Sequence, residues 1–183
     1  MRCNIIFHSI GGNIYLIARS FKEALALEGV DTRLYRILDS DLHVLAADRN
    51  DVNEYYEEIE ELPVANNEKL RSADLIMFGL PSRFGMPSAE FKTFLDNTTD
   101  LFESRELEGK LYYSFATSTY SHKDALDAIE ATDSWAAMMG LYAVDFPQYT
   151  HKDGLMMPSR PGQELEEVAK RFASTAASLL KES

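Results

Sequence analysis

The sequence predicts an α/β fold in which helices cover both faces of a parallel sheet of five strands. Apolar runs of strand length alternate along the chain with amphipathic segments of helical period. The run Leu75–Gly79 is apolar throughout, as expected for a strand buried on both faces. The 183 residues suffice for one α/β domain with a proper core and are too few for two. We therefore expect a single domain over residues 1–183, with right-handed crossovers between its strands.

The first third of the chain is expected to supply two strands and one clear helix. Arg2–Phe7 is a short apolar run typical of a buried strand, and the apolar residues of Ile14–Glu28 recur on one face of a helix that ends at Gly29. Asp31–Ile37 alternates polar and apolar residues, which favours a strand exposed on one face at an edge of the sheet. The acidic stretch Leu38–Glu61 indicates only a weakly amphipathic helix.

The middle third is expected to supply the second and third interior strands of the sheet, counted after Arg2–Phe7, with a helix between them. Leu75–Gly79 leads into a polar loop, and the loop leads into a helix expected over Pro87–Thr98, with Pro87 in its first turn. A third interior strand, Leu111–Thr117, follows. In an open α/β sheet ligands bind at the carboxyl ends of the strands, so the loops after these strands are candidate binding loops.

The last third is expected to close the sheet and cover it. A helix over His122–Met139 ends at Gly140, and a fifth strand follows at Leu141–Phe146. The loop Gln148–Gly162 shows no regular period. The final helix, Gln163–Leu180, carries apolar residues on one face, so we expect it to pack against the sheet.

Composition and charge exclude several classes of protein. The net charge of −12 argues against nucleic acid or an anionic membrane surface as a partner, because both are polyanions. The single cysteine, Cys3, lies in the first apolar run, where we expect a buried thiol that fits a reducing cytosol. No apolar run reaches the ~18 residues that span a bilayer. Since Met1 leads almost directly into a strand, we expect no signal peptide and a cytoplasmic location.

The loop after the first strand, His8–Asn13, has the composition of an anion-binding loop. Small residues let backbone N–H groups approach a phosphate, and the amino end of the following helix adds a favourable dipole. Ser9 and Asn13 can add side-chain hydrogen bonds. A glycine pair that simply makes a turn, with Asn13 as helix cap, is the open alternative. The loop matches neither a dinucleotide fingerprint nor a Walker loop, which argues against nucleoside triphosphate chemistry.

The loops after the second and third interior strands carry groups suited to a planar heteroaromatic ring. In Pro81–Gly85, Ser82 offers a hydroxyl, Arg83 a cation and Phe84 a flat apolar surface. Taken alone, this loop fits a structural turn better, with Arg83 in solvent. Ala116–Ser121 clusters hydroxyls beside Tyr120, and its alternative is the capping region of the helix that begins at His122.

Metal and nucleophile motifs do not occur in this sequence. The four histidines show no spacing typical of metal ligands, and no serine nucleophile motif of the GxSxG type occurs. We therefore expect no metal site and assign no catalytic residue. Arg83 and Tyr120 are the side chains expected to lie nearest a bound ring.

Together these motifs resemble the flavodoxin-like superfamily, and most closely its WrbA-type NAD(P)H:quinone oxidoreductases within the NADPH-dependent FMN reductases. FGLPSRFGMPSAEFKTFLD, at Phe78–Asp96, is similar to that family's Phe-Gly-x-Pro-Thr-Arg-Phe-Gly followed by a helix with Phe-Leu-Asp. HSIGGNI matches the family's Ser-x-x-Gly-His-Ile phosphate loop at Ser9, Gly12 and Ile14. The elements follow the same order over nearly the whole chain, although the carboxyl third matches weakly.

The resemblance implies a doubly wound sheet of order 2-1-3-4-5 and a non-covalently bound FMN reduced by NAD(P)H, with a quinone-like acceptor. It also implies a homodimer or homotetramer, in which Phe102 stands where the family has a tryptophan that lines the substrate pocket. The implied FMN-binding residues are Ser9, Ile10, Gly11, Gly12, Asn13, Ile14, Pro81, Ser82, Arg83, Phe84, Gly85, Ala116, Thr117, Ser118, Thr119 and Tyr120.

Departures from the family pattern leave two other functions open. The family's third loop is rich in glycine, whereas Thr117–Lys123 contains none, and a family histidine is replaced by Met138 or Met139. The insertion before the last helix is shortened around Tyr149–Pro161. The main alternative is a flavodoxin-type electron carrier without its own substrate, which the acidic charge fits. A descendant that has lost the flavin is the other.

Overall fold

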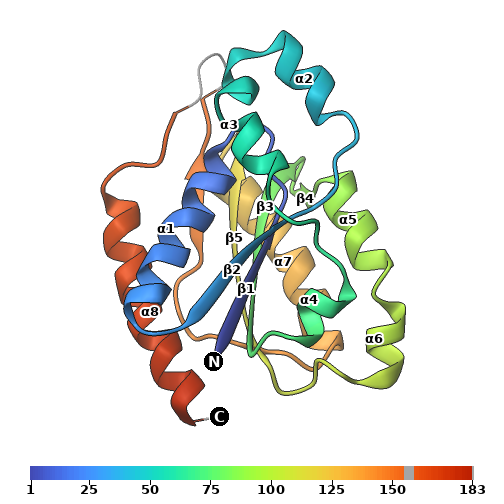
Figure 1. The fold of residues 1–183 in the computed structure, drawn as a ribbon, viewed down its shortest axis with the longest axis vertical. Coiled ribbons are helices and arrows are strands. Elements are labelled where there is room, and N and C mark those ends of the chain that lie inside the picture. The colour runs from blue at the N-terminus through green and yellow to red at the C-terminus, as the bar shows by residue number, and fades with distance from the viewer. Residues whose placement is uncertain (155–158, 183) are drawn as a thin grey trace.

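A computed structural model describes residues 1–154 and 159–182 of the chain. Strands and helices alternate in it along most of the sequence (Figure 1). The strands are β1 (Arg2–Phe7), β2 (Asp31–Arg36), β3 (Leu75–Arg83), β4 (Met86–Pro87), β5 (Leu111–Ser118), β6 (Tyr142–Ala143) and β7 (Tyr149–Lys152). The helices are α1 (Asn13–Leu27), α2 (Leu42–Asp48), α3 (Asn50–Glu60), α4 (Asn67–Arg71), α5 (Ala89–Asp96), α6 (Thr99–Ser104), α7 (His122–Met138) and α8 (Glu164–Glu182).

The sheet has the predicted α/β architecture, with parallel strands in the order β2-β1-β3-β5-β6. This order differs slightly from the predicted 2-1-3-4-5, because the two-residue strand β4 pairs antiparallel with β3 outside the main path and because β6 and β7 share the fifth position beside β5. The register brings Phe7 beside Gly79 and Gly79 beside Phe115. The carboxyl ends of the three central strands therefore meet at one edge of the sheet, at the top of Figure 1.

The prediction of a single fifth strand over Leu141–Phe146 is wrong. Only the two residues of β6 pair with the lower part of β5, and β7 pairs with its upper part, at Phe115–Ser118. Pro147 has no N–H group and interrupts the pairing between them. The Tyr113 hydroxyl bridges this break, because it donates to the carbonyl of Pro147 (2.9 Å) and accepts from the N–H of Tyr149 (2.9 Å).

Four further expectations need correction. The strand β3 extends past Gly79 to Arg83, because its last residues find a partner in β4. Pro87 is part of β4 and not of the following helix, which begins at Ala89 with Ser88 as its N-cap. The stretch before Pro63 forms two helices, α2 and α3, where one was expected. Part of the predicted irregular loop Gln148–Gly162 is the strand β7, and residues 155–158 lie outside the described residues.

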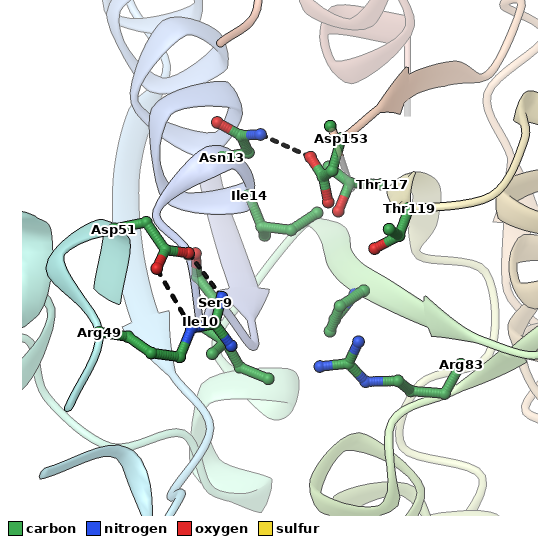
Figure 2. Close-up of a pocket in the computed structure, with 13 residues that line it drawn as sticks. Ser9, Ile10, Asn13, Ile14, Arg49, Asp51, Arg83, Thr117, Thr119 and Asp153 are labelled. Atoms are coloured by element: carbon green, nitrogen blue, oxygen red, sulfur yellow. Dashed lines mark hydrogen bonds and ion pairs between the residues drawn. The ribbon is translucent and has the colours of Figure 1, made fainter. Parts of the chain in front are cut away.

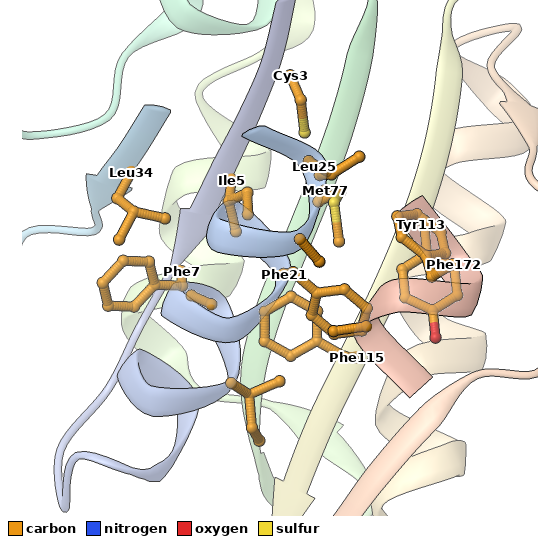
Figure 3. Close-up of a cluster of buried hydrophobic side chains, with 14 of the residues drawn as sticks. Cys3, Ile5, Phe7, Phe21, Leu25, Leu34, Met77, Tyr113, Phe115 and Phe172 are labelled. Atoms are coloured by element: carbon orange, nitrogen blue, oxygen red, sulfur yellow. The ribbon is translucent and has the colours of Figure 1, made fainter. Parts of the chain in front are cut away.

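Two apolar clusters lie on the two faces of the sheet, because side chains alternate between faces along each strand. Ile5 contributes to the cluster under α1 and α8, and Ile6 contributes to the opposite one under α5 and α7. In the first cluster the Phe21 ring contacts the rings of Phe115 and Phe172, with centroids 5.3 and 5.2 Å apart (Figure 3). Both faces are buried, so polar ligands can reach the sheet only at its edges.

Candidate functional site

A cavity of about 430 Å³ opens at the carboxyl ends of β1, β3 and β5 (Figure 2). This volume lies in the range of small-molecule sites. All three predicted loops contribute to it, and so do the start of α3 and the residues after β7. The residues that line it are Ser9, Ile10, Gly11, Asn13, Ile14, Arg49, Asp51, Pro81, Arg83, Thr117, Thr119, Asp153 and Gly154.

The first loop wraps the amino end of α1. Gly12 is the N-cap and has φ 86°, a left-handed conformation that favours glycine, and no side chain caps the helix there. Among the described residues the N–H groups of Asn13 and Ile14, in the first turn, have no partner and remain available to an anion. The Ser9 hydroxyl accepts a hydrogen bond from the N–H of Tyr15 (3.2 Å), which folds the loop back over the helix end.

One alternative for this loop made Asn13 the cap of α1. That alternative is wrong, because Asn13 is the first residue of the helix and Gly12 is its N-cap. Its side-chain amide donates to the Asp153 carboxylate (2.5 Å) and to the carbonyl of Ser159 (2.8 Å). The Arg160 guanidinium donates to the carbonyl of Gly11 (2.5 Å) and to Oδ1 of Asn13 (2.9 Å). Asp153, Ser159 and Arg160, which follow β7, therefore hold the first loop in place through these hydrogen bonds.

The second loop presents alternate residues to the cavity. Since β3 continues to Arg83, Pro81 and Arg83 face the cavity and Ser82 points to the other side. The Arg83 guanidinium has no hydrogen-bond or ion-pair partner among the described residues, and it points into the cavity in Figure 2. In a chain with a net charge of −12, a cation left free in a cavity indicates an anionic or electron-rich ligand.

The third loop repeats this alternation. Thr117 and Thr119 line the cavity, whereas the Ser118 hydroxyl points away and donates to Asp124 (2.6 Å). Ser121 caps α7 and accepts from the N–H of Asp124 (3.0 Å), which confirms the capping role expected for this serine. The predicted loop therefore has both roles, since its threonines face the cavity and its serines fix its shape.

Two exposed aromatic rings stand together at the rim, one from each of these loops. The ring of Phe84 is 83% exposed and stacks on Tyr120, with centroids 6.0 Å apart and planes 26° apart. Phe84 also has φ 57°, which is uncommon for a residue with a side chain. Neither ring lines the cavity in this structure. The pair is a flat apolar surface beside the cavity mouth.

The structure thus brings most of the predicted residues to one place. Nine of them line the cavity: Ser9, Ile10, Gly11, Asn13, Ile14, Pro81, Arg83, Thr117 and Thr119. Seven others belong to the same loops without lining it: Gly12, Ser82, Phe84, Gly85, Ala116, Ser118 and Tyr120. Phe102 lies on α6, at the opposite end of the sheet, so a single copy of the chain does not bring it to the cavity (Figure 1).

Sequence analysis missed four lining residues, and two of them form an ion pair. Arg49 and Asp51, at the start of α3, are 2.6 Å apart, and this hydrogen bond holds the pKa of Asp51 below its usual value. Asp153 and Gly154 follow β7, a strand that was not expected. Both carboxylates that line the cavity are engaged, Asp51 by Arg49 and Asp153 by the Asn13 amide, as the dashed lines in Figure 2 mark. The signal that could have found Asp153 is its place at the end of a strand.

Comparison with known proteins places the chain in a family. The family model described as NADPH-dependent FMN reductase matches residues 2–152. An NAD(P)H dehydrogenase (quinone) from Archaeoglobus fulgidus is 34% identical over 125 residues, which cover 66% of this chain and 63% of that relative. Another, from Aromatoleum aromaticum, is 28% identical over 203 residues and covers 98% of this chain and 97% of its own length.

Solved structures share the fold. A flavodoxin, WrbA-like protein from Agrobacterium tumefaciens superposes with a TM-score of 0.72 at 19% identity and covers 99% of this chain and 98% of its own. A flavodoxin from the domain Archaea superposes with a TM-score of 0.68 at 17% identity, over 99% of both chains. At such identities the likeness establishes the flavodoxin-like fold alone. In the described part of the chain, no helix has the length and apolar character needed to span a bilayer.

Proposed function

The chain belongs to the NADPH-dependent FMN reductase family, and on that premise we propose that it is an FMN-binding oxidoreductase that passes electrons from NAD(P)H to a quinone or a similar acceptor. The observation that carries the proposal is the convergence of three loops, foreseen separately in the sequence, on one cavity at the carboxyl edge of the sheet. That edge is where open α/β sheets bind their ligands.

The chemistry of the cavity suits FMN at both ends. Open N–H groups at the amino end of α1, beside Gly11 and Gly12, suit a phosphate. The Arg83 guanidinium, which has no partner in the described part of the chain, and the hydroxyls of Thr117 and Thr119 suit the polar rim of the isoalloxazine ring. The carboxylates in the wall do not oppose this assignment, because each is already engaged by a side chain of the protein.

When bound, FMN supplies the hydride and electron transfer, so the protein need only bind, orient and shield. Ser9 and the first-turn amides would hold the phosphate. Arg83 would place a positive charge at the ring, which favours the negative charge that the ring gains on reduction. Phe84 and Tyr120, at the rim, would cover apolar surface beside the open face. We assign no proton transfer to a side chain.

The finer assignments are also proposals. We propose a homodimer or homotetramer, supported by the half-exposed Phe102 ring, which only a second copy could bring to a cavity. We propose a cytoplasmic location, supported by the free and fully buried thiol of Cys3. The flavodoxin-type electron carrier remains the second candidate function, because a net charge of −12 suits docking to a basic redox partner.

Equilibrium titration of the purified, flavin-free protein with FMN tests the site. The wild type should bind one FMN per chain, with a change in the visible flavin spectrum. A Ser9→Asp variant should lose most of the affinity, because a carboxylate in the first loop repels the phosphate. Ser9→Asn is the matched control, since it has nearly the same shape without the charge. Equal FMN affinity in the two variants would show that the phosphate lies elsewhere.

A further inference from the structure

Asp124, in the first turn of α7, lies beneath the two loops that would hold the flavin ring. Its carboxylate accepts hydrogen bonds from the Ser82 hydroxyl (2.5 Å) and from the Ser118 hydroxyl (2.6 Å). The two serines come from different strands, β3 and β5, and their residues are 3% and 1% exposed. Asp124 itself does not line the cavity. One carboxylate thus ties together two separate segments of the site from behind.

Each serine also accepts hydrogen bonds from backbone amides of its own loop and so fixes the shape of that loop. The Ser82 oxygen accepts from the N–H of Gly85 (3.2 Å), which closes the turn that contains Phe84. The Ser118 oxygen accepts from the N–H of Tyr120 (2.9 Å) and of Ser121 (3.4 Å). The turn closed by Ser82 includes the left-handed conformation of Phe84, and the turn closed by Ser118 includes Tyr120, the ring that stacks on it.

The charge state of Asp124 sets the direction of these hydrogen bonds. An ionised carboxylate can only accept, so the Ser118 hydrogen must point toward it, and the Ser82 hydrogen must point toward the carboxylate or toward the main-chain carbonyl of Asp124, 2.9 Å away. The lone pairs of the two hydroxyls are then free to accept from the loop amides. Both serines donate to the same oxygen, Oδ2 of Asp124. An asparagine would present there either a neutral amide oxygen, which is a weaker acceptor than a carboxylate, or an NH₂ group, which would compete with the loop amides for the serine lone pairs. A neutral isostere would therefore disturb both the carboxylate contacts and the turns.

Resting on the proposed function, we propose that Asp124 is a positioning residue that holds the ring-binding loops 82–85 and 118–121 in register through Ser82 and Ser118, without touching the cofactor. A change at Asp124 should therefore affect the part of the cavity that would hold the flavin ring. Pro81 and Arg83 precede and follow Ser82, and Thr117 and Thr119 flank Ser118, so the residues that face the cavity alternate with the two that bind Asp124. Among the described residues, no hydrogen bond or ion pair joins this network to the phosphate half of the cavity, on β1 and α1.

The dipole of a helix favours an acidic residue in the first turn, and this effect alone could explain an aspartate at position 124 of α7. The two roles predict different results. The helix effect contributes to the stability of α7 and leaves the loops alone, whereas the positioning role acts on particular amides in both loops. Asp127→Asn is the matched control, because it removes the same charge one turn further along α7, where the carboxylate pairs with Lys123 (2.7 Å) and with neither serine.

Hydrogen exchange of the flavin-free protein gives the first readout, and it needs no bound cofactor. In Asp124→Asn, exchange at the amides of Gly85, Tyr120 and Ser121 should speed up about tenfold or more. Exchange at the amide of Tyr15, which bonds to Ser9 in the first loop, should not change. Asp127→Asn should leave all four amides at wild-type rates. If Asp124→Asn unfolds, Ser118→Ala takes its place and should speed exchange at Tyr120 and Ser121 only.

Flavin affinity gives the second readout. Asp124→Asn should weaken FMN and riboflavin by the same factor, about tenfold, because riboflavin shares the ring and lacks the phosphate. Ser9→Asp should weaken FMN far more than riboflavin. Wild-type exchange rates in Asp124→Asn, an equal effect from Asp127→Asn, or a loss confined to FMN would each overturn the proposal. A wild type that binds neither flavin would refute the proposed function instead, while the exchange rates would still decide whether Asp124 holds the two loops.

Discussion

The ring of Tyr55 lies directly against Gly12, so closely that a Cβ atom on Gly12 would overlap the ring. This contact joins α3 to the amino end of α1 and leaves room only for glycine in the first loop. The Arg160 guanidinium completes the arrangement, because it lies 5.1 Å from the centroid of the same ring. Helix α3, which the sequence indicated only weakly, is therefore part of the wall that shapes the proposed phosphate site.

A Gly12→Ala variant should lose more stability than its backbone conformation alone explains. A left-handed conformation costs alanine about 1 kcal/mol, and the collision with Tyr55 adds to it. Gly29→Ala is the matched control, because Gly29 has φ 80° and open space around it. Chemical denaturation should show a larger loss of unfolding free energy at Gly12 than at Gly29. Equal losses at the two positions would show that Tyr55 does not confine the loop.

Removal of the Arg160 side chain should weaken FMN binding about tenfold, since it breaks the hydrogen bonds to Gly11 and Asn13 that orient the first loop. Arg171→Ala removes another arginine that lies over a ring, that of Phe146, and should leave FMN affinity unchanged. Fluorescence titration of both variants with FMN measures the difference. An unchanged dissociation constant in Arg160→Ala would contradict this role.

Stability should fall in acid partly through Asp39, which is buried behind the first loop with His8 and Ser88. The His8 ring lies 3.0 Å from the Asp39 carboxylate, and this hydrogen bond lowers the pKa of Asp39 in the folded chain. The resulting stabilisation is complete above the usual aspartate pKa of about 4 and is lost as the pH falls through the lowered value.

An Asp39→Asn variant tests this relationship. At pH 7 it should be less stable than the wild type by about 1–3 kcal/mol, because a buried charged hydrogen bond is lost. The deficit should shrink as the pH falls below about 4. Urea denaturation of both proteins between pH 7 and pH 3 gives the two curves. Parallel curves over that interval would mean that Asp39 keeps its ordinary pKa when the chain folds.

The break in the fifth strand should depend on the Tyr113 hydroxyl. Tyr113→Phe removes the group that joins Pro147 to Tyr149 and should cost about 1 kcal/mol of unfolding free energy. Tyr142→Phe, at a tyrosine on β6 that is 65% exposed, should cost under about 0.5 kcal/mol. Thermal or urea denaturation compares the two. The same small cost at both positions would show that the β6–β7 break needs no bridge.

The order of the main strands could be predicted from the sequence because periodic apolar runs set the elements, and the family resemblance set the order. The position of the cavity followed from the rule that carboxyl ends of parallel strands share an edge. The sequence did not predict that the side chains of Ser82 and Ser118 point away from the cavity, because their direction depends on how far β3 and β5 extend. A two-residue strand, β4, prolongs β3 and thereby turns Ser82 away from the cavity toward Asp124.

Contacts between residues far apart in the sequence could not be predicted, because periodicity and motifs report only on neighbouring residues. Arg160 contacts Gly11 across 149 positions, and Asn13 contacts Asp153 across 140. Both partners in the carboxyl-terminal third lie where the sequence shows no period and where the family resemblance is weak. Arg49 and Asp51 lie in an acidic stretch that also lacked a strong period. Only the folded chain brings these groups to the first loop.

Anaerobic stopped-flow spectroscopy of the FMN-loaded protein tests the central claim most directly. NADPH or NADH should bleach the oxidised flavin band in single turnover, and a quinone added afterwards should restore it. The account is contradicted if neither nicotinamide bleaches the flavin while a reductase protein does, because the chain would then be an electron carrier.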